Sequence, residues 1–153
     1  MNRIRRTLLR SASALVAVAA GLIRPAVALA AEWNKAAFES KAVGDALRAI
    51  GATDAQPSKD VSIKAPDIAE NGAVVPVEVT SGIANTQAIA IVADKNPFPL
   101  VANFEFGAGG DGYASTRIKL GQTSNVRALV KTTDGKYFYA AKEVKVTIGG
   151  CGG

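Results

Sequence analysis

Histidine is absent from the 153-residue sequence, and cysteine and methionine occur once each. Without histidine the chain cannot build a Ser-His-Asp or Cys-His catalytic centre, or the common histidine metal sites. Copper sites need histidine, methionine or several thiolates, and the single methionine is Met1. Carboxylate, lysine and thiol chemistry therefore remain open, and no metal site is expected.

Acidic residues are also absent before Glu32, and this asymmetry accounts for the formal net charge of +5. Five arginines lie at or before Arg24, whereas the chain from Ala31 onward carries 13 basic and 13 acidic residues. A protein that follows a phosphate backbone needs clustered basic side chains. After Ala31 lysine and arginine are scattered singly among the acids, so nucleic acid is not an expected partner.

The only long apolar run belongs to the first 30 residues. Met1–Arg10 is basic, Ala12–Ile23 is apolar, and Ala28–Ala30 has the small-x-small pattern of a cleavage site. A membrane anchor is the alternative, but the run is shorter than the roughly 20 residues that a bilayer requires. Residues 1–30 are therefore predicted to be an export signal, and the mature chain is expected to start at Ala31 without a membrane anchor.

The basic part of this leader contains Arg5-Arg6-Thr7-Leu8-Leu9-Arg10. Paired arginines ahead of an apolar pair and a basic residue resemble the twin-arginine signals that carry folded proteins across the bacterial membrane. The h-region is only mildly hydrophobic, because alanine is its commonest residue. We expect export into the periplasm by the twin-arginine pathway.

A helical pattern covers only the start of the mature chain. Apolar residues between Ala31 and Ile50 recur at spacings of three, four or seven, and Gly51 stands where a C-cap is expected. Thr53–Asp60 contains Pro57 and is predicted to be a linker. After it the apolar period changes from near four to two, which is typical of strands.

About seven or eight short segments with strand character follow, separated by turn signals such as Asn71-Gly72 and Asp134-Gly135. Ala88–Ala93 is continuously apolar, as expected of a strand buried on both faces or in a sandwich core. Pro76 implies an edge or a bulge. The segments cover 61–64, 73–80, 88–93, 101–106, 113–120, 126–131, 137–142 and 144–148. This pattern favours a mainly β, immunoglobulin-like antiparallel β-sandwich with an N-terminal helix over residues 31–148.

One glycine-rich segment matches a nucleotide-binding motif. Gly107-Ala-Gly109-Gly110-Asp-Gly112 has the spacing G-x-G-x-x-G, which works by directing a helix N-terminus at a pyrophosphate. Strand alternation rather than a helical period follows from Tyr113, so a flexible hairpin loop is predicted instead.

Several charged residues are candidates for acid-base chemistry. Asp67, Glu70 and Glu78 could supply a carboxylate pair only if a cleft brought two of them together, which spacing in a sandwich does not predict. We interpret them as solvated surface charges. An exposed strand face is predicted for Lys142, Glu143 and Lys145.

The single cysteine lies third from the C-terminus, in Gly149-Gly150-Cys151-Gly152-Gly153. An odd cysteine in an exported protein implies intermolecular bonding or a thiol kept free for use. Glycine is conformationally permissive, so Gly149 and Gly150 are expected to form a loose tether that lets the thiol reach roughly 10 Å beyond Ile148. Gly152 and Gly153 add little bulk, which keeps the tip thin enough for a narrow channel.

The tail lacks the neighbours of a catalytic thiol. The nearest basic residue in sequence is Lys145, so nothing local would lower the pKa of Cys151. Activation by a partner suits a covalent carrier on a flexible arm better than an enzyme. The alternatives are a disordered tail with an incidental cysteine, against which the four glycines argue, and an exported binding module whose Cys151 forms an interchain disulfide.

The terminal pentapeptide resembles the signature of the SoxY sulfur carriers of bacterial thiosulfate oxidation, and Val144–Ile148 leads into it as in that family. Three internal stretches are similar to the same family: Pro66–Pro76, Asn96–Leu100, and Ser115–Lys119 continuing through Thr123–Arg127. With the twin-arginine leader, the resemblance spans the whole chain.

This resemblance implies a periplasmic, immunoglobulin-like, non-catalytic subunit that forms a heterodimer with SoxZ. Cys151 matches the carrier cysteine, to which the haem enzyme SoxAX would join thiosulfate oxidatively. SoxB, a manganese hydrolase, would release sulfate and leave a persulfide, and SoxCD, where present, would oxidise the outer sulfur. The cofactors belong to these partners, and the carrier is expected to need none.

Overall fold

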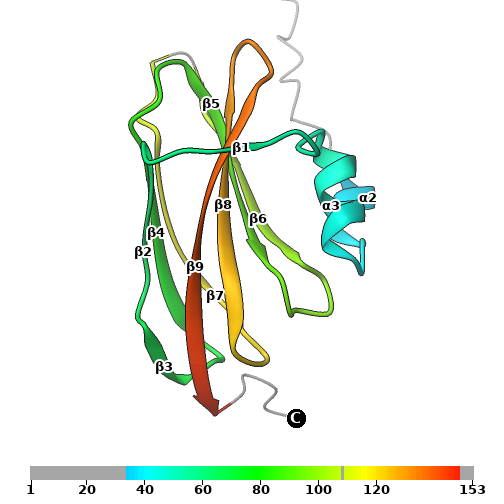
Figure 1. The fold of residues 1–153 in the computed structure, drawn as a ribbon, viewed down its shortest axis with the longest axis vertical. Helices are drawn as coiled ribbons and strands as arrows, with labels where there is room; N and C mark the ends of the chain where they lie inside the picture. Colours follow the sequence, from blue (N-terminus) through cyan, green and yellow to red (C-terminus); the bar gives the residue numbers. More distant parts are fainter. Residues whose placement is uncertain (1–33, 108, 149–153) are drawn as a thin grey trace, which may run out of the picture. The chain divides into compact units, whose positions relative to one another are not determined.

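The computed structural model describes residues 34–107 and 109–148, so the predicted export signal and the terminal pentapeptide lie outside the described residues. The described part of the chain has three layers: a three-stranded sheet, a larger sheet and a pair of short helices (Figure 1). The predicted β-sandwich is confirmed. Among the described residues, no helix is long and apolar enough to cross a membrane.

Strands of the described chain form two facing sheets. Sheet A has the order β1-β9-β8-β5-β6, with β3 also paired to β9, and sheet B has the order β2-β4-β7. Pairings are antiparallel except those of β1 and β3, which run parallel to β9. The bounds are β1 Gln56–Pro57, β2 Val61–Lys64, β3 Ile68–Asn71, β4 Val75–Ser81, β5 Thr86–Ala93, β6 Leu100–Glu105, β7 Tyr113–Ile118, β8 Ser124–Thr132 and β9 Tyr137–Ile148.

Side chains that alternate along the strands build the main core between the sheets. In β4, Val75, Val77 and Val79 are fully buried, and they pack with the inward residues of β5 and β8. Pro76 lies on the outer face, where β4 pairs with β7 alone because β2 ends opposite Glu78. The position of Pro76 therefore agrees with the edge that its missing N–H predicts.

Strand β5 is buried on both faces, as its apolar run predicts. Ile89 and Ile91 face the core between the sheets. Ala90 and Val92 face the other way, into a second cluster formed with the helices and with Leu129 of β8. Sheet A thus lies between sheet B and the helix layer (Figure 1).

The helical region differs from the prediction of one helix. It contains α2 (Lys35–Phe38) and α3 (Val43–Ile50), with Ala42 in an extended conformation between them. Ala37 and Ala46 are both completely buried in the second cluster. Nine residues apart, they would point in opposite directions on one continuous helix, which turns about 100° per residue. The break lets both alanines face sheet A.

Specific contacts hold this helix pair in place. Asn34 accepts a hydrogen bond from the Ala37 N–H and donates its side-chain amide to the Ala49 carbonyl at 3.0 Å. Gly51 caps α3 as predicted, in the left-handed conformation at φ 80°, which favours glycine. The Tyr137 hydroxyl of β9 donates to the Ile50 carbonyl at 2.5 Å, and burial, followed by the charge of Glu105, raises the pKa of this tyrosine.

Three predictions about strands need correction. β3 was not predicted, since its four residues show no clear alternation. The predicted linker contains the two-residue β1, which pairs with the start of β9. The two predicted strands 137–142 and 144–148 form the single twelve-residue strand β9.

Candidate functional site

The predicted functional residues Cys151, Gly149, Gly150, Gly152 and Gly153 lie outside the described residues. We call residues 149–153 the arm and Val144–Ile148 the arm root. The described part of the site is the root, together with the end of the sandwich at which β9 stops, which we call the arm end. These features determine where the arm starts and what surrounds its attachment.

The strand that pairs with β9 changes at the arm root. Along one edge β9 pairs with β8 as far as Val144, which is fully buried. Beyond Val144, β9 pairs in parallel with β3: Lys145 with Ile68, Val146 with Ala69, and Ile148 with Asn71. The short strand β3 therefore holds the last four residues before the arm.

Two threonines add side-chain hydrogen bonds at the root. The Val146 N–H donates to the Thr123 hydroxyl at 3.0 Å, and the Thr147 hydroxyl donates to the Glu70 carbonyl at 3.1 Å. Thr123 belongs to the β7–β8 loop, whereas Glu70 belongs to β3. The root is thus fixed from two directions, so the reach of the arm is measured from Ile148.

Lys142 is less exposed than the prediction of an exposed strand face implies. Its ammonium group donates to the Ala65 carbonyl at 2.6 Å and lies 3.0 Å from a carboxylate oxygen of Asp67. The Lys142 side chain is 32% exposed, whereas Glu143 and Lys145 are exposed as predicted. Lys142 therefore fastens the β2–β3 connection to β9, just ahead of the parallel pairing with β3.

The connections at the arm end are hydrogen-bonded to one another. The Asn96 side chain donates to the Lys119 carbonyl at 2.7 Å and accepts from the Gly121 N–H at 3.3 Å. The Leu120 N–H donates to the Gly72 carbonyl at 2.7 Å. These bonds join the β5–β6 turn, the β7–β8 loop and the β3–β4 turn in one assembly.

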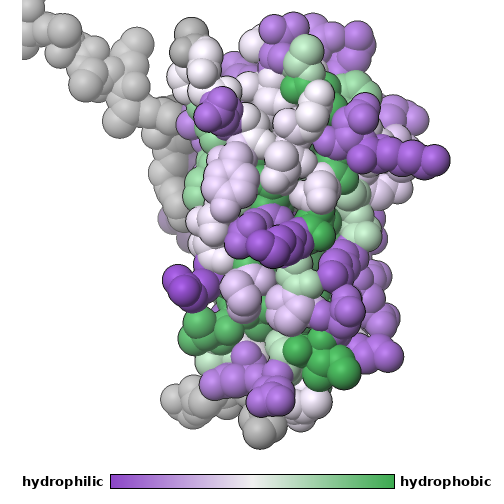
Figure 2. Space-filling view, turned by 90° about the vertical axis from the view of Figure 1, so that its left-hand side faces the viewer, coloured by the Kyte–Doolittle hydropathy of each residue, from purple (hydrophilic) through white to green (hydrophobic). Residues whose placement is uncertain are grey.

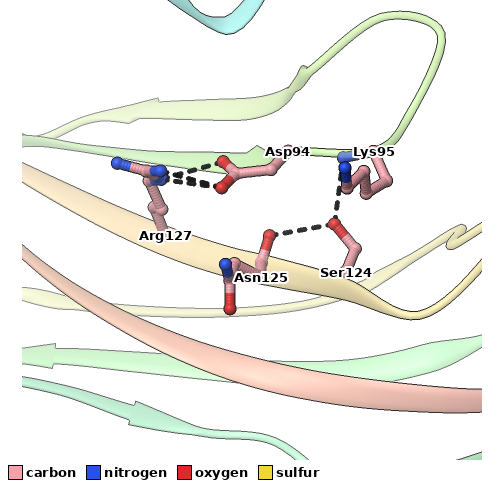
Figure 3. A network of polar contacts seen from close by, with 5 residues as sticks. All are labelled: Asp94, Lys95, Ser124, Asn125 and Arg127. Atoms are coloured by element: carbon pink, nitrogen blue, oxygen red, sulfur yellow. Dashed lines mark hydrogen bonds and ion pairs between the residues drawn. The ribbon is translucent and has the colours of Figure 1, made fainter.

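A polar network in Figure 3 links the same turn to β8. Arg127 donates to both oxygens of Asp94, with distances of 2.8 and 3.1 Å from its Nε and 2.8 Å from Nη2. Ser124 is buried; its hydroxyl accepts from the Lys95 N–H and donates to the Asn125 carbonyl. Hydrogen bonding to Asp94 raises the pKa of Arg127, against the opposing effect of burial. This fork fixes the β5–β6 turn against β8.

The glycine-rich segment is followed by a strand, whereas the nucleotide-binding motif requires a helix there. The segment joins β6 of sheet A to β7 of sheet B, so the predicted hairpin loop is a connection between sheets. Gly109 has φ 79°, and a Cβ on Gly112 would lie 3.0 Å from the Ser81 Cβ. Backbone conformation and close packing account for these two glycines without a ligand.

The three candidate carboxylates are surface charges, as predicted. Asp67 pairs with Lys142, Glu78 pairs with Lys64 at 3.3 Å, and Glu70 is exposed on β3. Across residues 34–107 and 109–148, no group of three or more His, Cys, Asp or Glu side chains could hold a metal ion.

The sequence does not predict the arm end as a unit, although the stretches that form it carry the family resemblance. The internal stretches that carry the family resemblance supply the β3–β4 turn, the β5–β6 turn and residues on both sides of the β7–β8 loop. Their convergence depends on the order of strands in two sheets. The only sequence signal was that all of these stretches resembled one family.

Comparisons with known proteins point to one family. The family model described as sulfur oxidation protein SoxY matches residues 47–151. The chain is similar to the solved structure of the sulfur carrier protein SoxY from Chlorobium limicola f thiosulfatophilum. Their identity is 38% over 67% of this chain and 92% of that chain, with a TM-score of 0.60. No curated protein matches the sequence.

More distant similarity extends to superoxide reductases. A putative one from Thermotoga maritima is 19% identical over 60% of this chain and 93% of that chain, with a TM-score of 0.52. A neelaredoxin from Ignicoccus hospitalis is 18% identical over 56% of this chain and 78% of that chain, with a TM-score of 0.50. At these identities the similarity shows a shared β-sandwich fold alone.

Proposed function

The chain belongs to the SoxY family of sulfur oxidation proteins, and on that premise we propose that it carries sulfur intermediates of thiosulfate oxidation covalently on Cys151. The observation that carries the proposal is the span of the family match, which runs from residue 47 through Cys151 and includes the single thiol of the chain. The similar structure from Chlorobium, named as a sulfur carrier protein, supports it.

Loading of the carrier is an oxidation. The Cys151 thiol and thiosulfate combine to Cys–S–S–SO₃⁻, releasing one proton and two electrons, which a haem enzyme of the SoxAX type accepts. The new bond joins the Cys151 sulfur to the sulfane sulfur of thiosulfate. Thiolates form and break such sulfur–sulfur bonds readily, whereas a serine hydroxyl does not enter this exchange.

Unloading is a hydrolysis by a second partner. Water attacks the sulfonate sulfur of Cys–S–S–SO₃⁻ at a hydrolase of the SoxB type, and the sulfur–sulfur bond to the sulfonate breaks. The products are sulfate, one proton and a persulfide on Cys151. A SoxCD-type enzyme, where the host has one, would oxidise the outer sulfur before a second hydrolysis.

The carrier itself contributes position rather than catalysis. The arm root is held by β3 and by Thr123, and because three residues span at most about 10 Å, the chain length limits how far Cys151 can lie from that attachment. A partner can therefore hold the body at its surface while the thiol enters its active site. In this proposal the protein works in the periplasm as a heterodimer with a SoxZ-like subunit.

The test replaces Cys151 and follows adducts by mass. Wild-type protein recovered from thiosulfate-grown cells should carry reductant-labile additions of sulfur, or of sulfur with oxygen, on its C-terminal peptide. Cys151→Ser should carry none and should abolish thiosulfate oxidation while keeping the circular dichroism spectrum and unfolding midpoint of the wild type. Cys151→Ser combined with Ser115→Cys moves the thiol to an exposed position on β7 and should stay unloaded.

Two results would contradict the proposal. A Cys151→Ser strain that oxidises thiosulfate at the wild-type rate would remove the covalent role. A single disulfide-linked dimer with no small adduct, unchanged by thiosulfate, would instead identify Cys151 as an interchain disulfide in a binding module.

A further inference from the structure

Exposed apolar side chains gather at one end of the described sandwich. Four large hydrophobic residues stand out by their exposure: Ile68 at 58%, Val74 at 57%, Phe98 at 49% and Tyr113 at 48%. The first three belong to β3, the β3–β4 turn and the β5–β6 turn, all at the arm end, while Tyr113 pairs with Thr80 towards the opposite end of sheet B. Figure 2 shows strongly hydrophobic surface at the lower end of the sheet B face.

Strand register places two of these side chains around the arm root. Ile68 pairs with Lys145, and Asn71, three residues before Val74, pairs with Ile148. Paired strands lie about 4.8 Å apart, and three residues span at most about 10 Å. Ile68 and Val74 are therefore both within about 15 Å of the residue from which the arm departs.

The surface around these side chains is charged and firmly held. Asp67, Glu70 and Lys145 are exposed next to Ile68. The β3–β4 turn is fixed by the Leu120 N–H on the Gly72 carbonyl and by the Ala73 N–H on the Asn71 side chain at 2.8 Å. Apolar side chains within a polar rim, presented by an ordered backbone, are typical of protein interfaces.

The length of the arm decides which protein must cover this surface. An enzyme that acts on a group attached to Cys151 must bring its reaction centre within about 10 Å of Ile148, plus the length of the side chain. Active sites are concave and enclosed, so the rim of such an enzyme has to approach the arm end. A subunit bound permanently there would enclose the root and shorten the reach of the thiol.

We infer that Ile68 and Val74 form a docking surface for the enzymes that take up the arm, with Phe98 at the same end of the sandwich, and that this surface is distinct from the one that holds a permanent partner subunit. This inference rests on the proposed carrier function. Each enzyme complex buries a small apolar centre and dissociates after one reaction. Rapid dissociation is typical of transient complexes with small interfaces. One surface serves successive enzymes, because each must reach the same thiol.

The experiment compares apolar-to-acidic variants at the two ends of the molecule. Ile68→Asp, Val74→Asp and the double variant alter the arm end, and Phe98→Asp is measured separately. Tyr113→Asp is the matched control, since Tyr113 has similar exposure away from the root. Each full-length mature chain, with its copurifying subunit, is titrated as substrate for the host's haem enzyme and hydrolase, and kcat and KM are obtained.

The double variant should raise KM about tenfold or more with little change in kcat, because interface residues contribute mainly to association. Tyr113→Asp should leave both constants unchanged. Every variant should react with a small aromatic disulfide reagent at the wild-type rate, since the thiol itself is not altered.

Wild-type constants for the double variant would overturn the inference, as would an equal loss in Tyr113→Asp. Loss of the copurifying subunit from the arm-end variants would also overturn it, by assigning the surface to that permanent partner. Failure of the proposed carrier function can be told apart from failure of the docking inference, because in the former case the wild-type chain would not be loaded either.

Discussion

At the scale of single residues, buried polar groups at the ends of β8 are fully bonded. Ser124 and Thr132 are the buried polar residues of the described chain, at 3% and 5% exposure. The Thr132 hydroxyl donates to the Asp134 carboxylate, and the Thr132 N–H donates to the Lys136 carbonyl at 3.0 Å. The β8–β9 hairpin is therefore held by a small polar cluster as well as by its strands.

Asp134 makes one part of that hairpin sensitive to acid. Hydrogen bonds from Lys136 and then from Thr132 lower the pKa of Asp134 from 3.8 to about 2. A carboxylate with a depressed pKa in the folded state stabilises it above the unfolded pKa, and this contribution is lost as the pH falls through the folded value. The Tm difference between wild type and Asp134→Asn should therefore be present at pH 6 and disappear near pH 2.

Carboxyl titration by NMR provides the direct measurement. Lys136→Met should move the pKa of Asp134 back towards its ordinary value, because the Lys136 hydrogen bond is the largest cause of the shift. Lys131→Met is the control, since that ammonium lies over the Tyr137 ring at 6.0 Å. An unchanged Asp134 titration in Lys136→Met would contradict the assignment.

At the scale of elements, β9 has two parts with different support. Residues 137–144 pair with β8, whereas Lys145–Ile148 pair with the four-residue strand β3 and are fixed by Thr123 and Thr147. A short parallel pair contributes less than a long antiparallel ladder. The arm root is therefore the part of β9 that opens first.

Hydrogen exchange tests this difference in support. Backbone N–H groups of Val146 and Ile148 should exchange faster than those paired with β8. Thr123→Val removes the acceptor of the Val146 N–H and should speed exchange at Val146 about fivefold, as expected for a net loss of about 1 kcal/mol. The control is Thr80→Val, because Thr80 is an exposed residue of β4. Equal exchange rates along all of β9 would contradict the prediction.

Local patterns predicted elements better than their boundaries. The apolar run of β5 correctly predicted burial on both faces, and Gly51 correctly predicted the end of α3. The break between α2 and α3 could not be predicted, since it depends on Ala37 and Ala46 meeting the same sheet. The arm end could not be assembled either, because Asn96, Gly72 and Thr123 meet only through the strand order.

At the scale of the described molecule, the two sheets are covered unequally. Sheet A is buried by sheet B on one face and by α2 and α3 on the other, whereas the outer face of sheet B carries exposed residues such as Thr80, Ser115 and Arg117. The helix pair is therefore part of the hydrophobic core rather than an addition to the sandwich.

Removal of the helix layer should expose that second cluster. A chain beginning at Thr53 uncovers Ala90, Val92, Leu100 and Leu129, whereas a chain beginning at Ala31 keeps them covered. We expect the shorter chain to self-associate in size-exclusion chromatography and to lose on the order of 3–5 kcal/mol in its free energy of unfolding by urea. A monomer with the same urea midpoint as the longer chain would show that the helices contribute nothing to the core.

The attachment of the arm to β9 also has a mechanical consequence. Strand β9 has β8 along one edge and β1 and β3 along the other, so pulling on the arm directs tension along the strand axis. The hydrogen bonds to β8 lie across that axis, and they are loaded together in shear instead of being broken in sequence. A tether fixed to the end of an isolated hairpin would peel its strands apart under a smaller force. Under the proposed carrier function, withdrawal of the arm from an enzyme should therefore release the thiol before β9 separates from β8, which leaves the body folded.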